Sequence, residues 1–159
     1  MAEKLDLYDI DGNKLGKTIV RGEKPAEGQF IKLVVVYIKS GDKYLLQKCS
    51  KEKGGEFAVT GGHVSAGNTS EEQVQIEIKE ELGVDIDVAK LKRLGNIYRR
   101  QAMFDVYLYE DENFENVKLK LQTEEVEGVF WLAKTEIEAL IEKGLVRESS
   151  CQHYDKFIR

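Results

Sequence analysis

Cysteine and proline are scarce in this chain of 159 residues, which contains two cysteines and one proline. The cysteines, Cys49 and Cys151, lie far apart and match no metal-binding or redox spacing, and such sparse use is typical of a reducing compartment. The longest apolar run, residues 33–38, is much too short to span a bilayer. With no recognisable signal peptide, these features predict a cytoplasmic protein that does not enter the membrane.

Positive charge is also in short supply, because the formal net charge is −5. A protein whose main task is to bind a nucleic-acid polymer needs a basic surface, so that class of function is disfavoured. A small phosphorylated ligand stays compatible, since a bound metal ion can offset its charge. The hydrophobic content of 42% is typical of a globular protein, and the length predicts a single domain over residues 1–159.

Strand and helix signals alternate along the chain. Alternating apolar residues predict a hairpin over residues 1–20 that turns at Asp11 and Gly12. Two strands are expected within residues 30–50, a short strand within 55–64 that runs into a glycine loop, and others over 84–100, 102–110 and 126–132. Helices are expected over 69–82 and 133–144, and residues 145–159 have no firm assignment. This mixture predicts an α/β (α+β) sandwich.

The helix over residues 69–82 has the strongest signals. Thr69 or Ser70 can cap its first turn, and Gly83 ends it. At 100° per residue, three apolar side chains form one narrow stripe that should pack on the sheet: Val74, Ile78 and Leu82.

Three glutamates form a neighbouring stripe at spacing i, i+3 and i+4: Glu77, Glu80 and Glu81. The nearby Lys79 points to another side, so the helix supplies no counter-charge. A solvated acidic surface is one interpretation. The preceding glycine loop favours another, because glycines let backbone groups approach a ligand closely. Carboxylates and backbone oxygens together suit Mg²⁺ or Mn²⁺.

Residues 61–84 resemble the loop and helix of the Nudix (MutT-like) hydrolase signature. That signature is a Gly, five residues, a Glu, seven residues, then Arg-Glu, an aliphatic, any residue, Glu-Glu, any residue, Gly and an aliphatic. The matching positions keep this spacing without a gap: Gly62, Glu77, Ile78, Glu80, Glu81, Gly83 and Val84. The resemblance implies the family's α/β/α sandwich with a mixed central sheet. The hairpin over residues 1–20 is similar to that of the branch related to isopentenyl-diphosphate isomerase.

The resemblance also implies a metal-dependent hydrolase. Such an enzyme cleaves a diphosphate linkage in a nucleoside diphosphate joined to another group, or in a related small molecule. Glu77 and Glu81 would be ligands of Mg²⁺ or Mn²⁺, and Glu80 would assist directly or through water. Gly61 and Gly62 would lie beside the substrate, with one backbone carbonyl as a further metal ligand.

Other candidate residues lie outside the helix. The family often recruits another glutamate from a later loop as base or ligand, and we favour Glu125 over Glu124, although a solvated loop fits both equally well. His63 could face a ligand or simply bond to the backbone. Arg99 could contact a substrate phosphate, with a surface charge as the alternative. A small-molecule diphosphate is the implied partner, and a homodimer is compatible with the family.

Four positions depart from the family's pattern. Asn68 and Ile76 stand where the signature has Glu and Arg, so a negative charge is lost and Glu80 lacks a pairing partner. Cys49 and Ser65 stand where relatives often carry an arginine and an acid. These changes predict a hydrolase with reduced or specialised activity, or a Nudix domain that binds a nucleotide or protein without cleavage. An isoprenoid diphosphate isomerase is a remote alternative, since residues 60–67 lack the cysteine which that chemistry uses.

Overall fold

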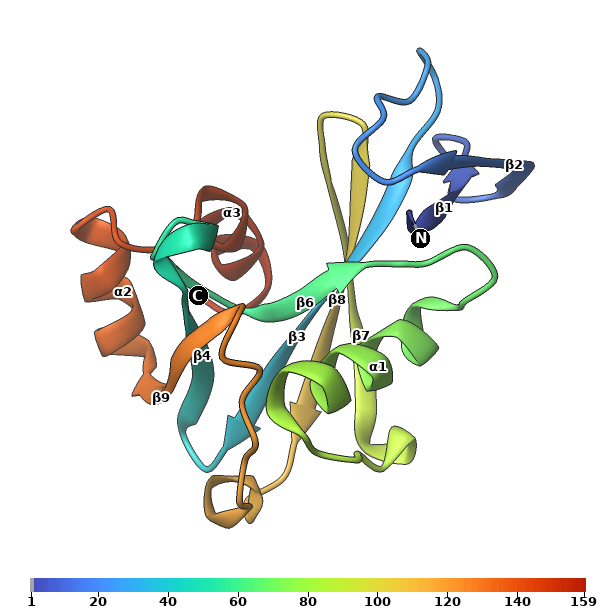
Figure 1. The fold of residues 1–159 in the computed structure, drawn as a ribbon. Coiled ribbons are helices and arrows are strands. Elements are labelled where there is room, and N and C mark those ends of the chain that lie inside the picture. The colour runs from blue at the N-terminus through green and yellow to red at the C-terminus, as the bar shows by residue number, and fades with distance from the viewer. Residues whose placement is uncertain (1) are drawn as a thin grey trace.

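The computed structural model describes residues 2–159, which form two sheets and three α-helices (Figure 1). Strands β1 (Lys4–Tyr8) and β2 (Lys14–Val20) form the predicted hairpin. The larger sheet contains β3 (Ile31–Ser40), β4 (Lys43–Cys49), β5 (Phe57–Ala58), β6 (Thr60–His63), β7 (Leu91–Arg99), β8 (Ala102–Glu110) and β9 (Val126–Ala133). The helices are α1 (Ser70–Leu82), α2 (Lys134–Glu142) and α3 (Glu148–Phe157), and 3-10 turns cover Lys51–Lys53, Val88–Lys90 and Phe114–Asn116.

The larger sheet is mixed. Strand β3 runs parallel to β8, whereas the other strand pairs in this sheet are antiparallel. The strands lie in the order β5–β4–β3–β8–β7, with β6 also beside β3 and β9 beside β4. The predicted α+β class with a mixed central sheet is therefore confirmed.

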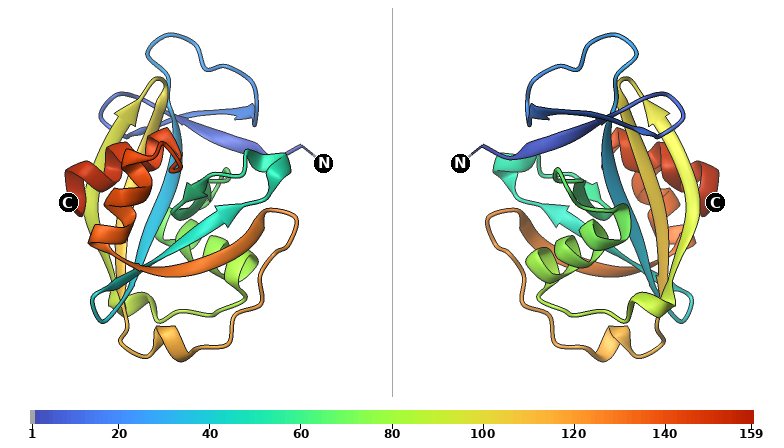
Figure 2. Two further views of the ribbon diagram at one scale, coloured as in Figure 1. Left: turned by 90° about the vertical axis from the view of Figure 1, so that its left-hand side faces the viewer. Right: turned by 90° about the vertical axis from the view of Figure 1, so that its right-hand side faces the viewer.

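Strand β3 is apolar on both faces because helices cover both faces of the sheet (Figure 2). Val34 and Val36 belong to the core that contains the buried residues of α1. Val35 and Tyr37 point the other way and belong to the core that contains Ile137 of α2. This alternation follows the two-residue period of a strand and produces the three-layer α/β/α arrangement.

Helix α1 begins and ends where the sequence predicts. The Thr69 side chain accepts a hydrogen bond from the backbone N–H of Glu72, and the Glu72 carboxylate accepts one from the backbone N–H of Thr69. Gly83 ends the helix in the left-handed conformation, with φ of 74°. The predicted apolar stripe is fully buried: Val74, Ile78 and Leu82.

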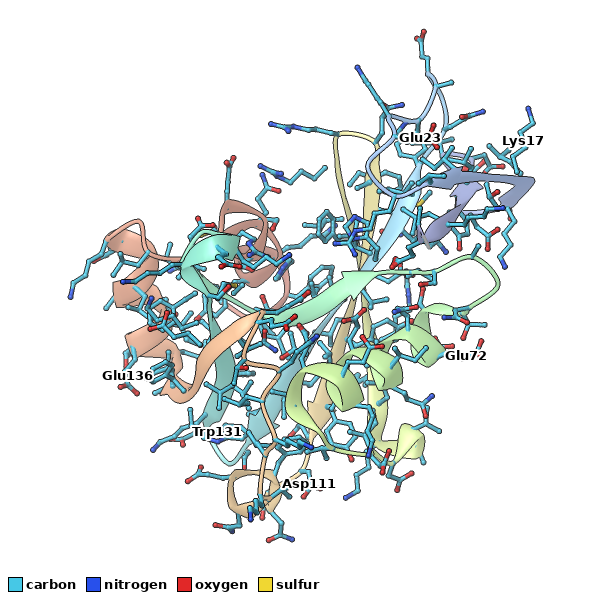
Figure 3. All side chains as sticks on the ribbon, in the orientation of Figure 1. Lys17, Glu23, Glu72, Asp111, Trp131 and Glu136 are labelled. Atoms are coloured by element: carbon cyan, nitrogen blue, oxygen red, sulfur yellow. The ribbon has the colours of Figure 1, made fainter. Side chains whose placement is uncertain are left out.

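Charged side chains cover the outside of the molecule. Those of Lys17, Glu72 and Glu136 are exposed and extend away from the cores (Figure 3). Within residues 2–159, no helix is long and apolar enough to cross a membrane.

The glycines before α1 lie in a strand, and the predicted glycine loop was wrong. Gly61 and Gly62 belong to β6 and pair with Val35 and Val34 of β3. A Cβ on Gly61 would lie 2.2 Å from the backbone oxygen of Val34, so only glycine permits this approach. The loop proper follows β6 and leads into α1.

Two other segments also differ from expectation. The strand expected over residues 84–100 begins only at Leu91, because Asp87 accepts a hydrogen bond from the backbone N–H of Ala89 and starts a 3-10 turn. The unassigned residues 145–159 contain α3. Its buried residues are Ser150, His153 and Tyr154, so the helix lacks the aliphatic stripe by which helices are recognised in a sequence.

The sheet divides beside β3, and this division makes room for a site. Strand β4 pairs with β3 at only two positions, Lys39–Tyr44 and Ser40–Lys43, before it turns toward β5 and β9. Strand β6 replaces β4 as the neighbour of β3 along residues 33–36. A cavity lies in the angle between the diverging strands, with α1 and α3 as its walls.

Candidate active site

The cavity has a volume of about 670 Å³ and is lined by side chains of both charge signs. Acidic side chains come from α1, from the loop before β9 and from Glu3, and basic ones are contributed by Arg21, Lys53 and Arg147. A site with this mixture can hold an anionic ligand together with a cation that neutralises it.

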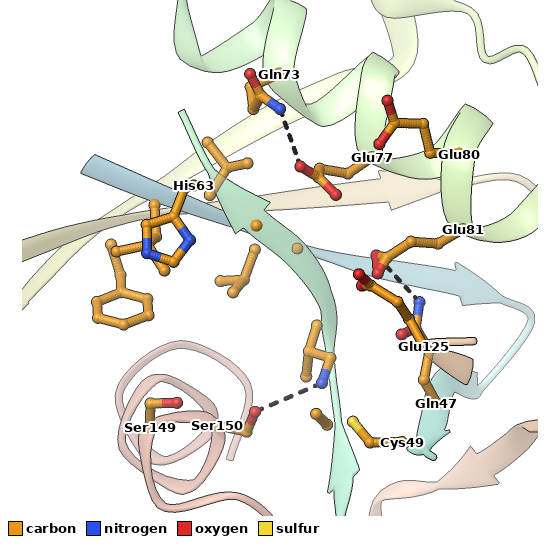
Figure 4. A pocket seen from close by; sticks show the side chains of 18 of the residues that line it. Gln47, Cys49, His63, Gln73, Glu77, Glu80, Glu81, Glu125, Ser149 and Ser150 are labelled. Atoms are coloured by element: carbon orange, nitrogen blue, oxygen red, sulfur yellow. Dashed lines mark hydrogen bonds between the residues drawn. The ribbon is translucent and has the colours of Figure 1, made fainter. Parts of the chain in front are cut away.

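Glu77 and Glu81 point into the cavity from successive turns of α1 (Figure 4). The Nε2 of Gln73 donates to Oε1 of Glu77 at 2.9 Å, whereas the Nε2 of Gln47 lies 3.5 Å from Oε1 of Glu81. Glu81 is only 6% exposed. Over residues 2–159, neither carboxylate forms an ion pair with a basic side chain.

Burial raises the pKa of both carboxyl groups. The pKa of Glu77 rises to about 7, mainly through burial, while the hydrogen bond from Gln73 opposes the rise. The pKa of Glu81 rises to about 8 through burial and, to a smaller extent, through the negative charge of Glu77. Carboxyl groups with such pKa values exchange a proton for a cation near neutral pH, so the pair suits a divalent metal ion.

The available oxygen donors fit Mg²⁺ or Mn²⁺. Across the described residues 2–159, no three Asp, Glu, His or Cys side chains stand together as a ready set of ligands. Magnesium commonly binds one or two carboxylates and completes its shell with water and substrate phosphates. Glu77 and Glu81 match that pattern, and Gly62, which has no side chain, lets the Glu77 carboxylate lie against the backbone of β6.

Glu80 and Glu125 are exposed residues at the edge of the same cavity. Glu125 reaches toward Glu81 from the loop before β9 (Figure 4). The loop is tied to the end of β4, because the backbone N–H of Ser50 donates to the Glu125 carbonyl at 3.1 Å. Glu124, the other candidate in this loop, is not among the lining residues.

Sequence reasoning missed Gln73, which is buried between the loop after β6 and Glu77. Its Oε1 accepts hydrogen bonds from the backbone N–H of Ser65 at 3.1 Å and from Nδ2 of Asn68 at 3.0 Å. Two of the four unusual positions, Ser65 and Asn68, therefore contact Gln73. The i, i+4 spacing of Gln73 and Glu77 was the available signal.

Sequence reasoning also missed Arg147, which precedes α3. Its Nη2 donates to the Sγ of Cys49 at 3.2 Å, and both residues line the cavity. A cationic side chain thus lies beside Cys49, although the two residues are 98 positions apart. Burial raises the pKa of the Cys49 thiol, which argues against a role as nucleophile. Ile76 is half-buried and lines the cavity as well.

A second pocket adjoins the first and shares His63, Leu33 and Phe104 with it. Burial, with a smaller effect of Arg21, lowers the pKa of His63 to about 4, so this imidazole is neutral at physiological pH. Arg99 lines only the second pocket and forms an ion pair with Glu148 at 3.2 Å.

Comparison with known proteins identifies the fold. Residues 31–150 match the sequence model of the NUDIX domain. The chain belongs to the Nudix family. It is 34% identical to an uncharacterized Nudix hydrolase of Listeria innocua over 148 residues, which cover 89% of this chain and 86% of that protein. A Listeria monocytogenes Nudix hydrolase has 32% identity with the same coverage. The Nudix signature recognised over residues 61–84 is thereby confirmed.

Solved Nudix structures share the architecture. A Deinococcus radiodurans crystal structure superposes with a TM-score of 0.82 at 21% identity, and the match covers 99% of this chain and 100% of that one. The chain also resembles a bifunctional NMN adenylyltransferase/ADP ribose pyrophosphatase of Francisella tularensis, which was crystallised with AMP and a manganese ion. The TM-score of this match is 0.65 at 14% identity, and the match covers 84% of this chain and 41% of that one. At these identities the likeness shows a common fold.

Proposed function

We propose that this Nudix domain hydrolyses a diphosphate linkage in a nucleoside diphosphate joined to another group, or in a related small molecule, with Mg²⁺ or Mn²⁺ as cofactor. The observation that carries the proposal is a pair of carboxylates, the half-buried Glu77 and the buried Glu81, which face a large cavity without a basic partner among residues 2–159. Two findings support the proposal: the Listeria relatives are Nudix hydrolases, and the Francisella protein is an ADP ribose pyrophosphatase that was crystallised with a manganese ion.

The acidic residues would have different roles, which depend on where each lies in the cavity. Glu77 and Glu81 would hold the cation together with a backbone carbonyl of Gly61 or Gly62, and the exposed Glu80 would assist directly or through water. When bound, the cation neutralises the carboxylates and polarises the phosphate oxygens. The Arg147 guanidinium, which lines the same cavity, can pair with a phosphate.

Hydrolysis joins a water oxygen to phosphorus, breaks the P–O bond to the leaving phosphate and releases one proton. Glu125 would accept that proton, and its exposed position at the cavity, where it reaches toward Glu81, supports this role. His63 and Arg99 would contact the part of the substrate that extends into the second pocket.

A substrate panel tests the proposal. Native protein and Glu81→Gln are incubated with nucleoside diphosphate sugars, dinucleotides and nucleotides in Mg²⁺ or Mn²⁺, and release of phosphate or nucleotide is measured. Cleavage by the native protein should fall at least about 100-fold in Glu81→Gln, since loss of even a supporting residue of a metal site costs about 10–100-fold. Equal turnover by the two proteins would contradict the proposal.

A second candidate function is nucleotide or protein binding without cleavage, and the apolar Ile76 in the cavity favours it. In that case the native protein should bind a nucleotide that it leaves intact. Asn68→Glu combined with Ile76→Arg should then create cleavage that the native protein lacks. Robust turnover by the native protein would exclude this alternative.

A further inference from the structure

We propose that Gln73, held by Ser65 and Asn68, is a positioning residue that orients the carboxylate of Glu77 for cation binding. The proposal rests on the proposed function in one respect, which is that Glu77 is a metal ligand. The new element is a chain of hydrogen bonds from uncharged donors, which runs from the loop after β6 through Gln73 to Glu77.

The orientation of the Gln73 amide follows from its partners. A backbone N–H can only donate, so the atom of Gln73 that faces the N–H of Ser65 at 3.1 Å must be the oxygen. The nitrogen therefore faces Oε1 of Glu77, 2.9 Å away. Gln73 is only 4% exposed, so water competes little for these hydrogen bonds.

Asn68 gives the oxygen of Gln73 a second donor, at 3.0 Å. The loop that carries Ser65 and Asn68 is itself anchored to the N-terminal hairpin. The backbone N–H of Ala66 donates to the Lys4 carbonyl at 2.8 Å, and that of Gly67 donates to Oδ2 of Asp6 at 2.9 Å. The hairpin thus fixes the loop, and the loop fixes the Gln73 amide.

The carboxylate of Glu77 is consequently held from two sides. Its Oε1 accepts from Gln73, while the backbone of Gly62 lies so near that a Cβ there would be 2.3 Å from Oε1 and 2.8 Å from Oε2. With Oε1 engaged by the amide, Oε2 is the oxygen best placed to bind a cation. A neutral amide also adds no positive charge that would repel the cation, as a lysine or arginine partner would.

Direct measurement of metal affinity tests this role. The dissociation constant for Mn²⁺ is determined from the electron paramagnetic resonance signal of free Mn²⁺, in native protein and in Gln73→Met. Methionine has a similar length but cannot donate a hydrogen bond, so the affinity should fall about 10–100-fold. Gln75→Met is the matched control, because Gln75 lies on the same helix and, among residues 2–159, its Nε2 donates only to the Glu71 carbonyl, at 3.4 Å.

Asn68→Leu provides a second test that leaves Gln73 in place. The affinity should fall by a smaller factor than in Gln73→Met, because the N–H of Ser65 still holds Oε1. This variant decides the question if Gln73→Met does not fold. Mn²⁺ affinity within twofold of native in the folded variants would overturn the proposal.

The Mn²⁺ dependence of turnover distinguishes a positioning role of Gln73 from a general loss of structure in the variant. If Gln73 positions Glu77, Gln73→Met should need more Mn²⁺ for half-maximal activity and recover most of its kcat when Mn²⁺ is saturating. A low kcat at every Mn²⁺ concentration would overturn the positioning role. Native protein that binds Mn²⁺ but cleaves nothing in the panel would favour the binding function over the proposed hydrolase, while the comparison of Mn²⁺ affinities still decides the role of Gln73.

Discussion

Glu77 packs directly against Gly62, and a Cβ at position 62 would lie 2.3 Å from Oε1 of Glu77. Hydrogen bonds between β6 and β3 hold the Gly62 backbone, so the side chain of Glu77 would have to move in Gly62→Ala. We expect this variant to lose about 10–100-fold in Mn²⁺ affinity and in kcat/KM, which calorimetry and steady-state kinetics measure.

Gly128→Ala is the control for that substitution. A Cβ there would meet only the ring of Phe130, at 3.7 Å, which is an ordinary contact. Native-like metal binding by Gly62→Ala would mean that Glu77 is not confined by the strand.

Cation binding should stabilise the folded protein. Mn²⁺ at about 100 times its dissociation constant should add about 2.7 kcal/mol to the free energy of unfolding, provided that the unfolded chain does not bind it. Thermal unfolding of native protein with increasing Mn²⁺ measures the gain. Glu77→Gln should show little of it, and an equal gain in that variant would place the cation elsewhere.

Arg147 should contribute to substrate affinity, because it lines the same cavity as the carboxylates. We expect Arg147→Ala to raise the KM for a diphosphate substrate about tenfold, which corresponds to the loss of about 1.4 kcal/mol of binding free energy. Lys17→Ala removes the same charge from the exposed strand β2 and should leave KM unchanged. A shared rise in KM would indicate an effect of net charge alone.

His153 should make stability depend on pH. It is fully buried, forms a hydrogen bond with the Tyr37 hydroxyl, and burial lowers its pKa to about 3. Because the unfolded chain binds this proton near pH 6.5 and the folded chain only near pH 3, stability is fully present above pH 6.5 and is lost as pH falls below it. The slope approaches about 1.4 kcal/mol per pH unit.

Urea unfolding between pH 7 and pH 4.5 measures this dependence, with His153→Gln as the comparison. The variant keeps a polar side chain but has no proton to gain, so its stability should fall less steeply with acidity. If the free energy of unfolding fell equally with acidity in the two proteins, His153 would be protonated in the folded state.

The sequence predicted the carboxylate helix well because its information is local. Thr69, Gly83 and the apolar stripe act within a few turns, and the structure has the cap, the end and the buried face where they were expected. The Nudix spacing is local too. Gly61 was wrongly expected in a loop. A glycine is required there because the backbone closely approaches Val34, which lies in another strand.

Arg147 and Gln73 were missed for a related reason. Arg147 meets Cys49 only because β4 and the segment before α3 converge in space, and nothing in either local sequence indicates this. Gln73 depends on an amide orientation that is fixed by Ser65 and Asn68 in a folded loop. Asn68 looked like a lost ligand in the sequence, whereas in the structure it is a hydrogen-bond donor to the residue that holds Glu77.

The wall of the cavity that α3 provides has a consequence for biosynthesis. The carboxylates belong to α1, whereas Ser149, Ser150 and His153 of the later helix α3 close the cavity on the other side. During translation, α1 can therefore pack on β3 before the cavity exists. The binding site is completed only when α3 (Glu148–Phe157) has also left the ribosome, so a nascent chain that still lacks this helix can carry the Nudix helix without being able to enclose a substrate.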